Sequence, residues 1–370
     1  MRTIKIRSQV ALTVLLGGIV GTGITETASA SGADGNLRAE LKVLAKQVSK
    51  KLCQAGEFSI SIGQVTGPPQ LASTGGPMIK HLLSEELKKR SVCLKMRSKF
   101  GLGARYRLVC DRKSGRQAVE LSGEVSDLDG NTIFTFRRLV FGEAVIASIF
   151  GVTCTLTSNG VVSREEAVVD KVRRPTADCQ KTKIRSCPKT PYSIEMLVWD
   201  ESCDRYKPLK AKTRDSLPFV DVGRDQEYGI RVHNHSDHDA AVRIYIDGLS
   251  LFSFSKKREY THVIVAANSS TLIKGWHRDN CVSNRFVVAR YADSPAAHIL
   301  KNTADIGTVT VMFSAAWTSS DDRPCDEPSA TPGSKSVNGT AIGRPVSVSY
   351  TEVSRWTGVV RSIVSVRYCR

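Results

Sequence analysis

The spacing of apolar residues changes along this chain, and the change restricts the folds open to it. Near the start, residues 36–54 and 77–89 carry an apolar side chain every three or four positions, which predicts two amphipathic helices. From residue 92 onward, most apolar residues alternate with polar ones, as in half-buried strands. Such a chain packs its helices on a sheet and then continues in β structure.

The first part of the chain predicts one small layered domain over residues 31–159. A strand-like run at 57–63 separates the two helices, and a short apolar helix is expected at 143–150. The resulting order α-β-α-β-β-β-β predicts an α/β sandwich with the helices over one sheet. The four later strands are expected at 92–100, 104–111, 117–126 and 131–141.

The second part, residues 191–370, predicts a β-sandwich, most simply an immunoglobulin-like one, because short strands recur between turn signals. The fold class is therefore α+β with two domains. Residues 160–190 are polar and basic and predict a linker, with a short helix near 163–172. Residues 319–344 show no apolar periodicity and predict an exposed, mobile loop. Strands are expected at 192–199, 217–222, 226–234, 239–247, 249–254, 260–266, 271–276, 284–291, 307–317, 345–352 and 359–368.

The first thirty residues have the pattern of an export signal. Arg2, Lys5 and Arg7 precede an uncharged apolar core at 10–24, and small residues at 28 and 30 predict cleavage after Ala30. The core is shorter than the roughly 20 residues that cross a bilayer, although an uncleaved anchor remains the alternative. We therefore expect a secreted or periplasmic protein that is soluble after cleavage.

The cysteines fit this location. The chain has 10 of them, all after the cleavage point, and an even number in an exported protein favours disulfides, although some could be small buried hydrophobes. Cys93 and Cys110 are expected not to bond directly, because the register inferred below sets Leu94 against Cys110.

The strongest electrostatic signal is a basic tract at residues 88–116, which contains eleven basic residues and one acid, Asp111. A turn at Gly101-Leu102-Gly103 between strands 92–100 and 104–111 predicts a β-hairpin. That register opposes Arg97 to Arg107 and Lys99 to Arg105, a ladder of like charges that solvent or an anion must relieve. The predicted anion or partner site is Lys95, Arg97, Lys99, Arg105 and Arg107; the alternative is a hydrated surface.

Motifs for cofactor or metal chemistry are otherwise absent from the sequence: it contains no P-loop, dinucleotide fingerprint, GxSxG or HExxH motif. His233, His235 and His238 are weak metal candidates, because alternate residues of a strand share a face. The alternative is a polar hairpin turn between strands 226–234 and 239–247. No metal, cofactor or catalytic residue is therefore predicted.

Two stretches resemble known bacterial envelope proteins. With Ser59–Pro69 and Ile79–Leu87, residues 36–141 resemble the small α/β domain of peptidoglycan-synthase activator lipoproteins and of flagellar and curli assembly factors, but the lipid-anchor cysteine of those activators is absent. The second half resembles a group of exported bacterial proteins of unknown role. The residues that carry this second resemblance are Ile246–Phe254, Tyr260–Val265 and Ile273–Trp276.

Charge and resemblance together predict a role. The whole chain has a net charge of +17, which favours anionic partners, although solubility alone could explain the excess. We expect a non-enzymatic binding or assembly protein of the cell envelope that contacts an anionic polymer, a membrane surface or an acidic protein. Nucleic acid is not the expected partner. The alternatives are a secreted hydrolase with its site between the domains and a purely structural envelope component.

Overall fold

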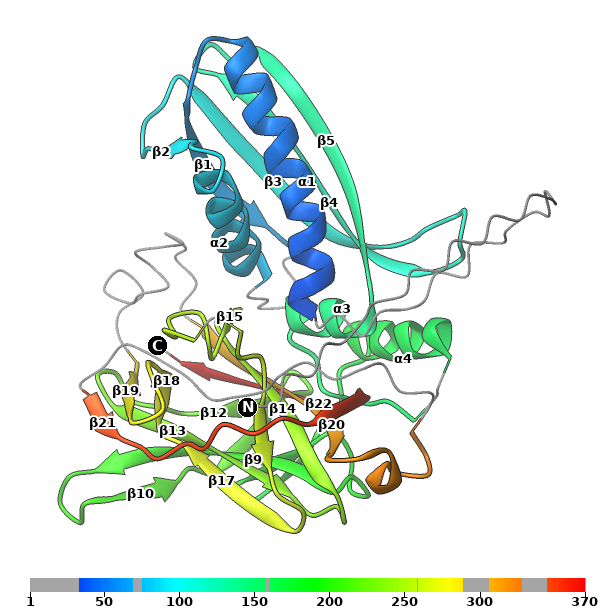
Figure 1. Cartoon of the computed structure of the whole chain (residues 1–370), viewed down its shortest axis with the longest axis vertical. Helices are drawn as coiled ribbons and strands as arrows, with labels where there is room; N and C mark the ends of the chain where they lie inside the picture. The colour runs from blue at the N-terminus through cyan, green and yellow to red at the C-terminus, as the bar shows by residue number, and fades with distance from the viewer. Residues whose placement is uncertain are drawn as a thin grey trace, which may run out of the picture.

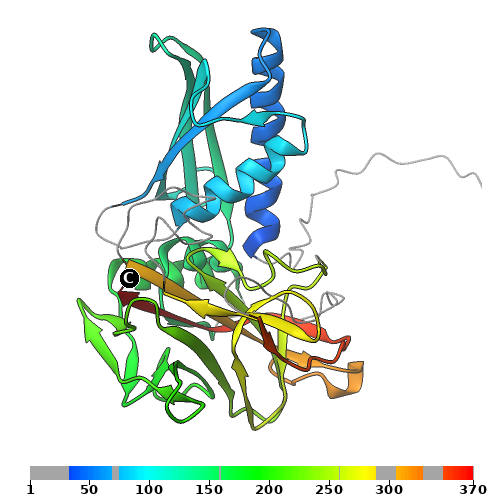
Figure 2. The same ribbon diagram turned by 90° about the vertical axis from the view of Figure 1, so that its left-hand side faces the viewer.

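The computed structural model describes residues 33–68, 75–157, 160–257, 259–288, 306–327 and 345–369. The predicted signal, residues 1–30, lies outside them, as do residues 328–344 of the predicted mobile loop. The described chain is mostly β structure, arranged in several sheets (Figures 1 and 2). None of its described helices has the length and apolar character that a membrane span requires.

The N-terminal part is built on a five-stranded sheet of order β2-β1-β3-β4-β5. Strand β1 runs parallel to β2 and β3, whereas β3, β4 and β5 are successive antiparallel neighbours. Helices α1 and α2 pack together against the apolar face of this sheet. The elements are α1 (Ala33–Gln54), β1 (Ser59–Thr66), α2 (Gly75–Lys88), β2 (Cys93–Leu94), β3 (Phe100–Cys110), β4 (Gln117–Asp127) and β5 (Thr132–Phe141).

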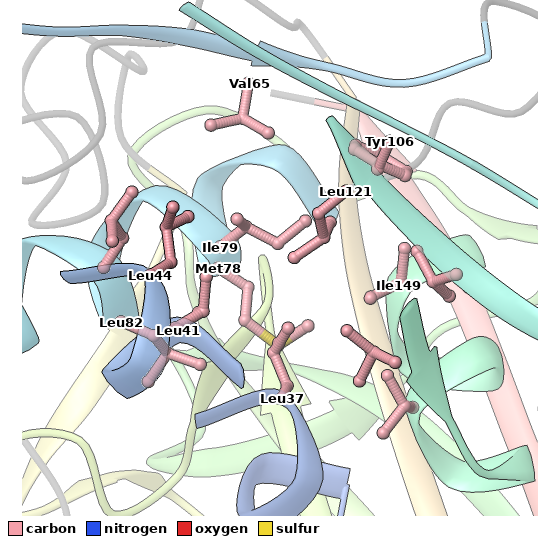
Figure 3. Close-up of a cluster of buried hydrophobic side chains, with 14 of the residues drawn as sticks. Leu37, Leu41, Leu44, Val65, Met78, Ile79, Leu82, Tyr106, Leu121 and Ile149 are labelled. Carbon is pink, nitrogen blue, oxygen red and sulfur yellow. The ribbon is translucent and has the colours of Figure 1, made fainter. Parts of the chain in front are cut away.

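The helical stripes predicted from the sequence form the centre of this part. Side chains from both helices, the sheet and the following helix α3 (Glu143–Phe150) meet in one apolar cluster (Figure 3). Their burial supplies most of the drive for packing helix on sheet. The cluster includes Leu37, Leu41, Leu44, Val65, Met78, Ile79, Leu82, Tyr106, Leu121 and Ile149.

The predicted basic hairpin is wrong. Strand β3 runs without a break through Gly101, Leu102 and Gly103, and Leu102 is 1% exposed. The apolar alternation from Phe100 to Leu108 continues through both glycines, which occupy positions on the opposite face and have no positive φ. Burial of Leu102 therefore favours a continuous strand over a turn at this position. Residues 95–99 form a crossover connection from β2 to β3.

Residues 160–190 are folded and do not form the predicted linker. Helix α4 (Val161–Arg173) buries Val168 in the N-terminal core, and β8 (Lys183–Arg185) buries Ile184 in the second core. Val168 and Ile184 are fully enclosed by neighbours that the local sequence does not reveal. The other elements of this region are β6 (Cys154–Thr155) and β7 (Asp178–Gln180).

Two larger sheets make up the rest of the chain and share the second apolar core. The first has the order β18-β19-β13-β9-β8-β7, with β10 beside β9, β17 beside β13 and β21 beside β19. Its further strands are β9 (Tyr192–Asp200), β10 (Arg205–Pro208), β13 (Glu227–Asn234), β17 (Ser269–Ile273), β18 (Gly275–His277), β19 (Val282–Val287) and β21 (Pro345–Ser347).

The second large sheet has the order β11-β12-β22-β20-β14-β15, with β16 beside β14 and β6 beside β22. Neighbouring strands are antiparallel except for the parallel pair β12 and β22. Its strands are β11 (Ala211–Arg214), β12 (Leu217–Val220), β14 (Asp239–Ile246), β15 (Leu249–Ser250), β16 (Val263–Val265), β20 (Ile306–Trp317) and β22 (Trp356–Cys369).

Part of the predicted loop at 319–344 is fixed in place. After the short 3₁₀ helix η2 (Ser320–Asp322), Glu327 is only 5% exposed. Its carboxylate accepts hydrogen bonds from the backbone N–H of Val359 (2.5 Å) and from Arg361 (2.7 Å). A buried carboxylate with these partners ties the start of the loop to β22.

Candidate functional site

The five predicted site residues are all exposed, but they belong to two different segments. Arg105 and Arg107 project from β3 on the sheet face opposite α1 and α2, because they alternate with buried Tyr106. Lys95, Arg97 and Lys99 lie on the crossover between β2 and β3. The five residues are therefore exposed basic side chains, as predicted, but they lie on β3 and the crossover and not on a hairpin.

The predicted ladder of opposed like charges is also wrong. Arg105 lies opposite Ser122 and Arg107 opposite Glu120, both on β4. Strand β4 can supply these partners because its polar residues fall on the face that the helices leave uncovered. The cross-strand neighbour of Arg107 is therefore a carboxylate, which removes the repulsion expected from the sequence.

A compact cluster of arginines centres on Glu120. An oxygen of its carboxylate lies 2.8 Å from Arg107 Nη2, and the other lies 2.5 Å from Arg137 Nε on β5. Arg105 Nε donates to Ser122 Oγ at 3.4 Å, and Ser122 pairs across β4–β5 with Arg137. Two guanidinium groups thus hold one carboxylate, and the third lies beside them at Ser122. We call Arg105, Arg107, Arg137 and Glu120 the arginine cluster.

Burial and charge act against each other at Glu120. The Glu120 side chain is 3% exposed, whereas those of Arg107 and Arg137 are 64% and 63% exposed. Burial by itself raises the pKa of the Glu120 carboxyl, but hydrogen bonds and positive charge from Arg107 and Arg137 outweigh it and hold this pKa below its ordinary value. The carboxylate therefore stays ionised, while both guanidinium groups still face solvent.

The crossover passes over β1 on the same open face. Ser98 Oγ lies 2.9 Å from Ser59 Oγ, and Ser61 Oγ donates to the carbonyl of Phe100 at 3.3 Å. Ser59 and Ser61 flank buried Ile60, so they point away from the helices.

The charges on this open face are unequal. Within the part of the chain that the structure describes, Lys95 and Arg97 have no ion pair, and Lys99 Nζ lies 3.9 Å from Glu57. The open face and the crossover together carry six cations and three carboxylates: Lys95, Arg97, Lys99, Arg105, Arg107 and Arg137 against Glu57, Glu120 and Glu124. We call these six cations the basic face. The surplus of positive charge makes it attractive to an anion.

The predicted site lacked Arg137 and Glu120. Arg137 is thirty residues from Arg107 and joins it only through the pairing of β3, β4 and β5. The alternation of residues 117–126 did place Glu120 on a polar face. A search for charged residues at outward positions of neighbouring strands would have found both.

The three candidate histidines do not converge. His233 Nε2 lies 3.0 Å from a carboxylate oxygen of Glu195. The rings of His233 and His235 stack, with 5.8 Å between their centroids. His238 Nδ1 donates to the carbonyl of Asp239 at 2.9 Å, and its other nitrogen faces Arg361 Nη1 at 3.4 Å. Among the described side chains, no three histidines, cysteines or acids are arranged to hold a metal.

The polar turn at 234–239 is not a hairpin either, because β13 and β14 belong to different sheets. The fully buried Asn234 amide holds this connection by donating to the carbonyls of His238, Val265 and Ala266. The polar residues of the turn thus have a structural role that sequence alone did not show.

The junction between the five-stranded sheet and the two larger sheets is packed. Tyr245, Met312, Val360 and Ile363 of the larger sheets belong to the same apolar cluster as α3 and α4. Arg164, 3% exposed, donates to Glu143 at 3.0 Å and also to the carbonyl of Val360. The described residues of this junction therefore form a continuous packed contact between the five-stranded sheet's helices and β22.

The nine cysteines whose side chains the structure describes are free thiols. Cys93 and Cys110 are among them, both exposed, on strands β2 and β3 that are not neighbours. The register that was used to argue against their bridge is nevertheless wrong.

Comparison of the chain with protein-family models, with curated proteins and with solved structures gave no match.

Proposed function

We propose that this protein is a non-enzymatic binding protein that holds an anionic polymer on the basic face. The observation that carries the proposal is the row Arg105, Ser122 and Arg137 beside Arg107 and Glu120, in which two of three exposed guanidinium groups share one carboxylate. Each guanidinium can still direct N–H groups outward to carboxylate or phosphate oxygens. The crossover lysines and Arg97 extend the positive charge along the same face.

A polymer suits this surface better than a single small anion. The cations are spread over two strands, β3 and β5, and the crossover, so they form a broad surface. Such a surface binds by exchanging counterions for phosphates or carboxylates, so its affinity should fall steeply with salt. An acidic protein or an anionic membrane would bind by the same physics and is an outcome of the test.

The location proposed for this role is outside the cytoplasm, at the cell envelope. The charged start, the short apolar core and the small residues before Ser31 support export. The resemblance of residues 36–141 to the small domain of envelope assembly factors supports the same place. The finer location, secreted or periplasmic, is part of this proposal.

We also infer that the chain consists of an α/β sandwich domain and an immunoglobulin-like domain. Strands β14, β20 and β22 are successive antiparallel neighbours, as C, F and G are in that fold. Strands β9, β13 and β19 follow one another in the facing sheet, in the positions of A, B and E. This order and the two separate apolar cores support the assignment.

The test measures binding of residues 31–370 to polyphosphate, polyglutamate and anionic lipid vesicles over a range of salt concentrations. Substituting glutamine for Arg105, Arg107 and Arg137 together should weaken polymer binding at least tenfold and reduce the salt slope by about 2–3. The matched control replaces three exposed lysines of α1, on the other side of the sheet, with glutamine: Lys42, Lys46 and Lys50.

The control variant loses the same charge, so equal losses in both triple variants would mean that only net charge matters and that the basic face is not a site. Preference for vesicles over both polymers would replace the polymer with a membrane surface as the partner. Binding of polyglutamate alone would favour an acidic protein. Absence of binding to all three would overturn the proposal.

A further inference from the structure

A second surface lies at a distance from the basic face, where residues 348–355 connect β21 to β22. This segment, which we call the strap, crosses the front of the two large sheets (Figure 1). Backbone N–H groups of Val348 and Tyr350 donate to the carbonyls of Cys281 and Asn280, both at 3.0 Å. The strap is thereby tied at its start to the turn between β18 and β19.

Two side-chain contacts hold the rest of the strap. Tyr260 Oη donates to Glu352 at 3.0 Å, and Arg355 Nε lies 3.0 Å from an Asp239 carboxylate oxygen at the start of β14. Between these ties the strap forms no strand of its own. It therefore bridges the surface at a few points and does not close it with a continuous ladder of hydrogen bonds.

Between the strap and strands β14, β16 and β17 lies a groove of about 470 Å³. This volume falls within the range of roughly 300–1,000 Å³ that is usual for small-molecule sites. Both aliphatic and hydroxyl-bearing residues line the groove. The aliphatic residues of the lining are Ile264, Ala266, Leu272, Val348 and Val353, and the hydroxyl-bearing residues are Thr271, Ser349, Tyr350 and Thr351.

Charge in the groove is positive at one place. Of its three charged residues, Asp239 and Arg355 neutralise each other in the ion pair that holds the strap. Lys274 has no ion pair within the described ranges, and its side chain is half-buried at the groove. A lysine ammonium acts as a compact point charge with three donors, which suits a single anionic group.

We propose that this groove binds a small amphipathic monoanion, with its apolar body along Ile264, Leu272 and Val353 and its anionic group at Lys274. The apolar wall contributes affinity by burying hydrocarbon, and Lys274 with the nearby hydroxyl groups fixes the orientation. This site is independent of the polymer-binding role, because it uses different strands and none of the six cations of the basic face.

The test uses two fluorescent probes that differ in one group. 1-Anilinonaphthalene-8-sulfonate carries a sulfonate, whereas N-phenyl-1-naphthylamine has the same rings without it. The wild type should bind the sulfonate probe at least tenfold more tightly than the neutral one, and decanoate should displace it. Lys274→Met, which keeps an apolar stem, should remove about tenfold of the sulfonate affinity and leave the neutral probe unaffected.

Two further variants keep the result interpretable. Lys189→Met removes an exposed lysine outside the groove and should change neither affinity. Val353→Trp fills the groove and should weaken both probes, and thermal unfolding of each variant verifies that it is folded. Equal binding of the two probes by the wild type, or equal effects of the two lysine substitutions, would overturn the proposal. Probe binding that survives both Val353→Trp and Lys274→Met would place it elsewhere and overturn it as well.

Discussion

Glu120→Gln should make the protein less stable and at the same time a stronger polyanion binder. The substitution keeps the shape of the side chain and removes the charge that Arg107 and Arg137 share. The amide oxygen can still accept from one arginine, but the amide NH2 group cannot accept from the other, and the two guanidinium groups then repel each other across it. A fall in stability together with a rise in polyanion affinity is therefore the result expected if one buried carboxylate bridges two arginines.

The stability cost depends on how far each of the three partners is exposed. Hydrogen bonds to charged groups contribute roughly 1.5–3 kcal/mol, but both arginines remain about two-thirds exposed and are hydrated without Glu120. We therefore expect a loss of about 1–2 kcal/mol in the free energy of unfolding at pH 7. The lowered pKa of Glu120 has the same origin, so its contribution is present above the unfolded pKa near 4.5 and is lost as pH falls through the folded value.

The binding gain follows from the added positive charge. If the carboxylate no longer offsets one cation, the slope of log affinity against log salt should steepen by about 0.9. Glu124→Gln is the control, because Glu124 is exposed on the same strand and accepts from Thr132 without bridging arginines. It should change stability by less than about 0.5 kcal/mol. Denaturant titrations in which both variants lose equally little stability would refute the bridge between Arg107 and Arg137.

Three other predictions test the interior. Arg367 is buried with two nitrogens unpartnered, and burial lowers its pKa to about 10, so Arg367→Met should leave stability unchanged or raise it. Arg164→Met should cost about 3 kcal/mol of stability, because it leaves the Glu143 carboxylate unpaired. Denaturant titrations in which Arg367→Met is the more destabilising variant would contradict this. His277 is buried, and burial lowers its pKa to about 3. Because the unfolded chain then binds the proton more tightly, the free energy of unfolding should fall by up to about 1.4 kcal/mol for each pH unit below about 6.5. His277→Phe should flatten this slope when unfolding is measured as a function of pH. A Cβ added at Gly103 has no neighbour within 4 Å, so Gly103→Ala should be tolerated. A Cβ added at Gly123 would lie 2.1 Å from the Gly103 carbonyl oxygen, so Gly123→Ala should destabilise the protein. A severe loss of stability from Gly103→Ala would favour the turn first predicted at Gly101–Gly103.

The packed junction changes what the two parts can do separately. Glu165 is fully buried, pairs with Arg116 at 2.6 Å and accepts from the backbone N–H of Gly142 at 3.1 Å. On the other side, buried Arg164 of α4 donates to the carbonyl of Val360 on β22. These buried contacts tie α3 and α4 to their neighbours on both sides, so residues 160–190 should resist the protease cleavage expected of a free linker.

Sequence periodicity determined the elements whose burial is decided locally. The helices at 36–54 and 77–89, the helix at 143–150 and the strands at 117–126 and 131–141 appear close to their predicted bounds. In each, one apolar face is wide enough to specify both the type of element and the side that is buried. The exposure of the basic residues followed from the same alternation, since a charged side chain beside Tyr106 or Leu108 must face away from the core.

Tertiary structure decided whatever depends on partners distant in the sequence. From the sequence, Gly101 and Gly103 predict a turn, but the core buries Leu102 between them and keeps the segment in a strand. The sequence also predicts a repulsive partner for Arg107, but pairing with β4 places Glu120 beside it. The strap and Lys274 form a groove only because β16 and β17 belong to different sheets. The physical reason is common to all three: local sequence fixes the conformation that a segment prefers, whereas strand pairing and shared burial between remote segments determine which charges become neighbours.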